Sequence, residues 1–479
     1  MKKSRPEFDL CVIGGGAAGL TVAAGAATLG AKVALVEKRA LGGDCLHYGC
    51  VPSKTLLHTA HVAHTMREAG RFGIPAHWPS IEMREVMRRV QAVIKTIEPH
   101  DSPERFRGLG VDVIFGHGRF VDQKICQVNE RAITANHFVL ATGSRPAVPP
   151  LPGLNGVTYL TNESVFALEE QVGRLIVLGA GPIGAELAQA FRRIGSEVDV
   201  VEQAPQVLPR EDADLAEIVA SQMRQEGVGF WLAHQALRVE RGAPGIRVFL
   251  KHLNGQEQCL SGTHLLVATG RRANVEYLGL EAAGVQVERG RIVTDTRLRT
   301  SNRRIYACGD VTGSHLFTHV AEHQAGVVLR NALFHWPARV ECKVIPWCTF
   351  TDPELARVGI SEADAKAAHV PHRVYTLPFG AIDRAHAAGA TKGHAKIITT
   401  PRGRLLGAAL VGPHTGELIH EYVLALAKGM SVSDLASVIH IYPTLAQINR
   451  RVAEQPMKGA LTPSRKRWLQ WLFGLQGMG

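Results

Sequence analysis

The chain has 479 residues, of which 46% are hydrophobic and 20% are charged, and its formal net charge is +11. This composition is that of an ordinary soluble protein, and the length is sufficient for two to four domains. The positive charge is spread along the chain and does not form one basic stripe with interleaved aromatic residues, so nucleic acid is excluded as a partner. The eight cysteines are scattered, which excludes a secreted disulfide scaffold.

A glycine-rich motif near the start of the chain predicts a nucleotide-binding unit. An apolar strand is predicted at 8–13, and a tight turn and a helix follow it. These elements account for the uncharged run at 10–31, which is therefore not interpreted as a signal peptide or membrane span. The glycines of this motif are Gly14, Gly16 and Gly19.

The same motif returns in the middle of the chain, with a strand predicted at 174–178 and a helix at 185–194. Glu37 follows the last glycine of the first copy by 18 residues, and Glu202 follows that of the second copy by the same distance. Each copy predicts a βαβ module in which the glycines let the backbone approach a pyrophosphate, while the acid accepts hydrogen bonds from ribose hydroxyls. The glycines of the second copy are Gly179, Gly181 and Gly184.

Two cysteines five positions apart, Cys45 and Cys50, indicate redox chemistry. A segment of this kind is expected to open a helix, whose dipole stabilises a thiolate, and the two sulfurs are then close enough to form a disulfide. Buried core cysteines or half of a metal site are the alternatives. Gly43 and Gly49 allow close approach to a flat ligand. Asp44 is expected to raise the pKa of the Cys45 thiol by like-charge repulsion.

Together these features resemble the flavoprotein disulfide reductases, the family of lipoamide dehydrogenase, glutathione reductase and mercuric reductase, over residues 6–455. The segments 140–143 and 267–270 are similar to those that join the nucleotide domains of that family to their neighbours. Segment 300–310 is similar to its second FAD motif, whose aspartate faces the ribityl chain. The resemblance places cofactor contacts at Gly43, Thr142, Gly143, Gly270 and Asp310.

The resemblance implies an α/β fold with two Rossmann-like dinucleotide-binding domains and a C-terminal α+β interface domain that forms a homodimer. The first module would hold FAD and the second NAD(P)H. The expected divisions are an FAD-binding domain at 1–150 and 271–340, an NAD(P)H-binding domain at 151–270, a dimerisation domain at 341–460 and a basic aromatic tail at 461–479.

The resemblance also implies an ion pair between Lys54 and Glu186, close to the flavin. A cation there stabilises negative charge on the reduced flavin, and a buried carboxylate holds the cation in place. Glu202 can bind a free ribose 2'-hydroxyl but repels a 2'-phosphate, so NADH is expected in preference to NADPH. Arg210 is the residue that argues for NADPH.

The C-terminal part departs from the family pattern. The lipoamide and glutathione branches use a His next to Pro, with a Glu five residues later, as a base supplied by the partner subunit. Tyr442 and Gln447 occupy these positions here. A phenol titrates near ~10 and an imidazole near ~6.5, so Tyr442 donates a hydrogen bond but is a poor proton acceptor. His440 and His47 are alternative bases. Mercuric reductases end in a cysteine pair, whereas no cysteine follows Cys348.

These patterns predict an NADH-oxidising FAD enzyme in which electrons pass to Cys50, the thiolate next to the flavin, and Cys45 meets an unidentified small-molecule acceptor. No resident metal is expected, because the histidines at 58, 61 and 64 fan around a helix. In the tail at 463–479, three cations precede two Trp, which is typical of an interfacial anchor or of a helix packed on protein. A membrane-associated NADH:quinone-type reductase and a non-catalytic redox sensor are the alternative functions. The expected location is cytoplasmic, with membrane contact through the tail.

Overall fold

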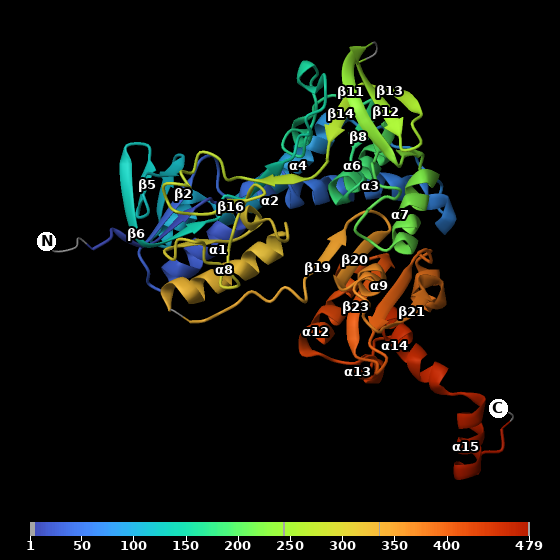
Figure 1. Cartoon of the computed structure of the whole chain (residues 1–479). Helices are drawn as coiled ribbons and strands as arrows, with labels where there is room; N and C mark the ends of the chain where they lie inside the picture. Colours follow the sequence, from blue (N-terminus) through green and yellow to red (C-terminus); the bar gives the residue numbers. More distant parts are fainter. Residues whose placement is uncertain (1–4, 243–244, 335, 478–479) are drawn as a thin grey trace. The chain divides into compact units, whose positions relative to one another are not determined.

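The computed structural model describes residues 5–242, 245–334 and 336–477 and divides into two compact units, which are described separately (Figure 1). The first four residues of the expected FAD-binding domain and the last two of the tail lie outside the described residues. Unit 1 consists of Met1–His64, Trp78–Val201 and His234–Glu341, and unit 2 consists of Thr65–His77, Glu202–Ala233 and Cys342–Gly479.

The first module of unit 1 is built on a parallel sheet with the order β3-β2-β1-β6, and β18 also pairs with β6 in parallel. The central strands β1 and β2 are mostly apolar and largely buried, as is usual where helices cover a parallel sheet. β4 and β5 extend the same sheet in antiparallel fashion. The strands are β1 Phe8–Ile13, β2 Val33–Glu37, β3 Asp112–Phe115, β4 Gly118–Phe120, β5 Ile125–Val128, β6 Arg131–Leu140 and β18 Ile305–Ala307.

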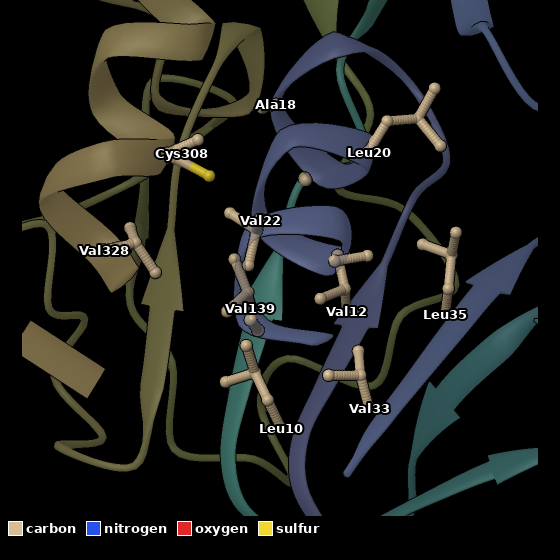
Figure 2. Close-up of a cluster of buried hydrophobic side chains, with 14 of the residues drawn as sticks. Leu10, Val12, Ala18, Leu20, Val22, Val33, Leu35, Val139, Cys308 and Val328 are labelled. Atoms are coloured by element: carbon tan, nitrogen blue, oxygen red, sulfur yellow. The ribbon is translucent and has the colours of Figure 1, made fainter. Parts of the chain in front are cut away.

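Two helices of this module, α1 and α8, lie side by side and share one hydrophobic core with the sheet (Figures 1 and 2). Leu10 of β1, Val22 of α1 and Val328 of α8 are fully buried in it. Cys308 lies in the same core, and burial raises the pKa of its thiol to about 12, so this cysteine packs and does not react. The helices are α1 Ala17–Thr28, α2 Gly43–His47, α3 Cys50–Arg67, α4 Met83–Ile97, α5 Pro103–Gly108 and α8 Thr318–Leu333.

The second module of unit 1 repeats the pattern with the parallel order β9-β8-β14. The predicted strand at 174–178 is confirmed as β8. Helix α6 begins three residues before the predicted start because Pro182 suits the first turn of a helix. A three-stranded antiparallel sheet, β11-β12-β13, follows. The elements are β8 Arg174–Leu178, α6 Pro182–Arg193, β9 Glu197–Val201, β11 His234–Gly242, β12 Gly245–His252, β13 Glu257–Gly262 and β14 His264–Val267.

The same steric constraint explains why the third residue of each motif is a glycine. A Cβ on Gly19 would collide with the carbonyl oxygen of Gly14, and a Cβ on Gly184 would collide with that of Gly179. The helix of each module therefore approaches the preceding turn so closely that only glycine fits. This agreement between copies 165 residues apart supports the predicted duplication.

The remaining short strands of unit 1 connect the modules. β7 Ser144–Pro146 pairs with β15 Arg271–Ala273, so the two segments that follow the landmark sequences at 140–143 and 267–270 lie together. β16 Val287–Glu288 pairs with β17 Arg291–Ile292.

Unit 2 contains a five-stranded antiparallel sheet with the order β19-β20-β23-β22-β21, and its core includes the fully buried Tyr422 and Phe379. The expected α/β class with a C-terminal α+β domain is thus confirmed. The strands are β10 Val228–Trp231, β19 Pro346–Thr349, β20 Glu354–Gly359, β21 Arg373–Pro378, β22 His394–Thr399 and β23 Leu405–Gly412. The helices are α7 Ala213–Gln225, α9 Glu362–Ala367, α10 Asp383–Ala387, α11 Thr415–Leu418, α12 His420–Lys428, α13 Val432–Ser437, α14 Gln447–Ala460 and α15 Pro463–Phe473. Among the described residues, none of the helices has both the length and the apolar character to span a bilayer.

Candidate active site

The two cysteines lie on either side of a helix boundary. Cys45 is half-buried inside the short helix α2, and the exposed Cys50 is the first residue of α3. The predicted helix start is therefore confirmed for Cys50. The hydroxyl of Thr318 lies 3.5 Å from the Cys50 sulfur.

The environment separates the acidities of the two thiols. The pKa of Cys50 is lowered to about 6, first by its hydrogen bond with the Cys45 side chain and further by Thr318 and the Lys54 cation. The pKa of Cys45 is raised, first by the same hydrogen bond and then by burial. Cys50 is thus the thiolate and Cys45 the thiol, in the order that we expected. The pKa of Cys45 is raised chiefly by Cys50 and by burial, whereas Asp44 is among the main causes for Cys50, whose pKa it raises.

Lys54 and Glu186 come from the two different modules and meet in an ion pair of 2.7 Å. The contact that the resemblance implied is therefore confirmed. Lys54 lies one helical turn after Cys50 on α3, so the cation and the thiolate share one face of the helix. Glu186 is buried in α6, whereas 36% of the Lys54 side chain is exposed. Lys54 is therefore paired with a buried carboxylate and is still partly exposed to solvent.

The first glycine motif fits a dinucleotide. Helix α1 has Gly16 as its N-cap, without a side-chain cap, so its first N–H groups could hold an anionic group such as a pyrophosphate. A Cβ on Gly43 would lie 2.7 Å from the Gly16 Cα, which shows how closely the dithiol segment approaches this turn. Glu37 accepts hydrogen bonds from the backbone of Gly15 and Arg39, each 2.7 Å long, so its carboxylate lies at the turn.

The landmark residues beyond the motif include Asp310, which contacts the segment that follows Gly143. Ser144 donates a hydrogen bond of 2.6 Å to Asp310, whose pKa is raised by burial. Thr142 donates to the carbonyl of Asn274, 2.7 Å away, and Gly143 separates Thr142 from Ser144. Gly270 precedes the paired strand β15. These residues all belong to unit 1, and their contact with a cofactor stays a prediction.

This arrangement of a glycine turn, a dithiol at a helix start and a lysine one turn later is matched by family models over nearly the whole chain. Residues 8–325 match the model of the pyridine nucleotide-disulphide oxidoreductases, and residues 345–452 match that of their dimerisation domain. The chain belongs to this family. FAD and NAD(P)H are the cofactors that membership implies.

Curated relatives in the family include enzymes with different substrates. A mercuric reductase of Staphylococcus aureus is 34% identical over 443 residues, which cover 92% of this chain and 81% of that protein. A dihydrolipoyl dehydrogenase of Chlamydia trachomatis is 36% identical over 448 residues, with coverages of 92% and 95%. Among solved structures, the Cu(II) complex of the HOCl-induced flavoprotein disulfide reductase RclA from Escherichia coli matches with a TM-score of 0.85 and 29% identity, over 94% of this chain and 100% of that one.

The NAD(P)H residues of this family member lie in different units. Gly179, Gly181 and Gly184 belong to unit 1, where Gly181 is the N-cap of α6. Glu202 belongs to unit 2, and its carboxylate accepts a 2.9 Å hydrogen bond from the backbone of Ala204. Their part in nucleotide binding stays a prediction.

The two residues at the predicted positions of the base, Tyr442 and Gln447, lie in the dimerisation domain. Tyr442, 66% exposed, donates a 3.1 Å hydrogen bond to Asp383. The Gln447 amide donates to the carbonyls of His440 and Ile441, so it supports the loop before α14, and an amide does not act as a base at neutral pH.

The two histidines that we considered as alternative bases, His440 and His47, have hydrogen-bond partners in the structure. Both ring nitrogens of His440 have partners, the Glu421 carboxylate at 2.9 Å and the Val438 carbonyl at 3.0 Å. The Nε2 atom of His47 lies 2.8 Å from the Leu41 carbonyl. Among the described residues, no group of three or more His, Cys, Asp or Glu side chains could hold a metal ion.

The sequence did not indicate the neighbours of Asp44. The Arg271 guanidinium lies 3.1 Å from one carboxylate oxygen, and the Asn162 amide donates to the other, also at 3.1 Å. Arg271 directly follows the landmark Gly270, and this position is the one feature of the sequence that could have pointed to Arg271. Asn162 lies in no motif.

Proposed function

We propose that the protein is an FAD-dependent enzyme that oxidises NADH and passes two electrons to the Cys45–Cys50 disulfide and then to a small-molecule acceptor. The observation that carries the proposal is the arrangement of Cys50 and Lys54 on one face of α3, with Lys54 paired to Glu186. FAD, when bound, supplies the two-electron carrier between the nicotinamide and the sulfurs. NADH is favoured over NADPH because the Glu202 carboxylate repels a 2'-phosphate.

The residues of the chain have separate roles in this reaction. Two electrons and one proton convert the disulfide into a Cys45 thiol and a Cys50 thiolate. Cys50 remains a thiolate at neutral pH because its pKa is about 6, and Lys54 stabilises the adjacent negative charge. Cys45 then loses its proton and attacks an acceptor disulfide, or transfers the electron pair to another oxidant. Attack of the Cys50 thiolate on the Cys45 sulfur restores the disulfide and releases the reduced acceptor.

The dimerisation domain supports a homodimer as the active form. In it, Tyr442 of the partner subunit would approach the dithiol as a hydrogen-bond donor. A phenol with a pKa near ~10 cannot readily take the thiol proton at neutral pH. We therefore expect weak exchange with lipoamide or glutathione, and acceptors that need no base, such as a metal ion or quinone, become more favourable candidates.

The test is NADH consumption by the purified flavoprotein with a panel of disulfides, quinones, Hg²⁺ and Cu²⁺. Cys45→Ser should abolish turnover with the physiological class of acceptor while the protein remains yellow. Tyr442→His should raise turnover with lipoamide or glutathione by about tenfold, because an imidazole is a better base. A colourless protein, or equal rates for wild type and Cys45→Ser with every acceptor, contradicts the proposal. If no acceptor supports NADH turnover, although the flavin and the dithiol can still be reduced and reoxidised, the result supports the redox sensor instead.

A second function, electron transfer to a quinone at a membrane, is favoured by helix α15. Arg465, Lys466 and Arg467 lie in its first half, and the exposed Trp468 and Trp471 follow. No acidic residue follows Glu454 in the sequence, so the tail is suited to an anionic surface. Trp side chains favour the boundary between lipid and water, and adjacent cations attract anionic lipids. A second copy of the chain, with its charge of +11, is a less suitable partner for these cations.

Flotation with liposomes tests the membrane part. Vesicles with anionic phosphatidylglycerol should carry the protein, and phosphatidylcholine vesicles should carry much less. Trp468→Ala/Trp471→Ala should reduce flotation by about tenfold, whereas Trp78→Ala, which removes an equally exposed Trp outside the tail, should not. Equal flotation of all three proteins removes membrane association from the proposal.

A further inference from the structure

The segment that carries the two cysteines is held from outside by one buried amide. The Asn162 side chain is 7% exposed, and its NH₂ group donates to the Asp44 carboxylate and to the Tyr48 carbonyl, both at 3.1 Å. Asp44 directly precedes Cys45, and Tyr48 precedes Cys50 by two residues. One amide therefore spans the stretch between the two sulfurs and uses both of its hydrogens for this purpose.

Backbone hydrogen bonds on both sides of Asn162 hold this residue in place. Leu160, two residues before Asn162, accepts a backbone hydrogen bond from Val267 and donates one to Leu265. This segment therefore pairs alongside strand β14 of the second module. Thr161 and Ser164 close a turn around Asn162 through their own hydrogen bonds. The dithiol of the first module is thus held by a side chain that the second module positions.

The second oxygen of Asp44 is held by Arg271. The guanidinium lies 3.1 Å from this oxygen and donates to the hydroxyl of Ser144 at 2.7 Å and to its carbonyl at 3.1 Å. Only 11% of the Arg271 side chain is exposed, so its direction is fixed. Gly49 completes the fit, because a Cβ there would lie 3.0 Å from the Asp44 carbonyl oxygen and 3.1 Å from its carboxylate.

We infer that Asn162 and Arg271 are positioning residues of the dithiol, which hold Asp44 and the Tyr48 carbonyl so that Cys45 and Cys50 stay at the separation that a disulfide requires. The inference rests on the proposed redox role of these cysteines. A disulfide tolerates only a narrow range of Cα separations, and a segment that is already held there closes without further loss of chain entropy. Release of the segment should therefore disfavour the disulfide relative to the two thiols.

The experiment is equilibration of the purified flavoprotein in glutathione buffers, followed by quenching and measurement of the Cys45–Cys50 disulfide by mass spectrometry. In this equilibrium, one glutathione disulfide oxidises the two thiols and yields two glutathiones. Asn162→Ala should lower the equilibrium constant by about tenfold, which corresponds to a midpoint potential about 30 mV less negative. Asp44→Asn, which preserves shape but removes the ion pair with Arg271, should lower it by about threefold.

The matched control is Asn331→Ala. Asn331 is buried to the same degree in unit 1, and its amide also donates two hydrogen bonds, to the carbonyls of Arg297 and Ala338. We expect a similar loss of thermal stability from this change and no change in the disulfide equilibrium. If Asn162→Ala does not fold, Asp44→Asn carries the test.

The outcomes separate the two claims. A wild-type protein that forms no Cys45–Cys50 disulfide at any glutathione ratio contradicts the proposed function. A wild-type protein that forms it, with the same equilibrium constant as Asp44→Asn and any folded Asn162→Ala, contradicts the positioning role alone. A proportional change in the Asn331→Ala control also contradicts it, because the effect would then follow from general destabilisation.

Discussion

Lys54 and Lys396 are both paired with carboxylates, and they differ in how much of each lysine side chain remains exposed. Lys54 in α3 contacts the buried Glu186 and keeps 36% of its side chain exposed, one helical turn from Cys50. Lys396 in β22 is only 3% exposed and lies within 3.1 Å of three carboxylates. The difference shows how the same ion-pair chemistry either presents a cation to a ligand or holds elements of the fold together.

The surroundings of Lys396 explain its structural character. Its carboxylate partners are Asp212 and Asp214 at the start of α7 and Glu362 at the start of α9. Burial alone would lower the pKa of Lys396, but the hydrogen bonds to Glu362 and Asp214 outweigh burial and raise it. Asp212 also accepts hydrogen bonds from the first N–H groups of α9. One cation therefore joins a strand and two helix starts within unit 2.

The largest expected effect is the loss of this buried cation. Lys396→Met should lower the free energy of unfolding of unit 2 by about 3–5 kcal/mol, because Asp212 would stay buried without its cation. Urea unfolding, followed by tryptophan fluorescence, measures the change. Below the unfolding transition, NADH oxidation per folded molecule should equal that of wild type. A Lys396→Met protein with wild-type stability and reduced turnover would contradict the structural role of this lysine.

The second effect concerns the exposed cation. Lys54→Met should lower NADH oxidation by about 100-fold, because the developing negative charge at the site loses its stabilising cation. The loss of stability should be smaller than for Lys396→Met, since Glu186 can take up a proton. Stopped-flow kinetics and urea unfolding on the same samples compare the two losses. Wild-type rates in Lys54→Met would show that this lysine is structural as well.

The smallest effect is a shift in thiol acidity. In the wild type, the rate of Cys50 alkylation by iodoacetamide should rise through a midpoint near pH 6, because the thiolate is the reactive form. Lys54→Met should move the midpoint upward, since the cation that lowers this pKa is absent. Lys396→Met should leave the midpoint in place. A common midpoint for all three proteins would show that Lys54 does not act on Cys50.

The sequence allowed prediction of the parts that depend on local pattern. Strands β1 and β8 have the predicted bounds, and the two glycine turns follow from their spacing. The contact of Lys54 with Glu186 was accessible only through the family resemblance, because 132 residues separate them. The contact of Asn162 with Asp44, and that of Lys396 with Asp212, could not be predicted. Such polar pairs have no periodicity and form only when distant segments pack together.

The collision that excludes a side chain at Gly19 and Gly184 has a genetic consequence. Each glycine is needed only by the turn of its own module, so an alanine at one position damages one nucleotide site and spares the other. A Gly19→Ala allele should yield a protein that cannot retain its yellow chromophore. A Gly184→Ala allele should yield a protein that keeps its yellow colour but is not reduced by NADH. Artificial reductants should then reduce the flavin of the Gly184→Ala protein, whereas they cannot restore activity to the Gly19→Ala protein.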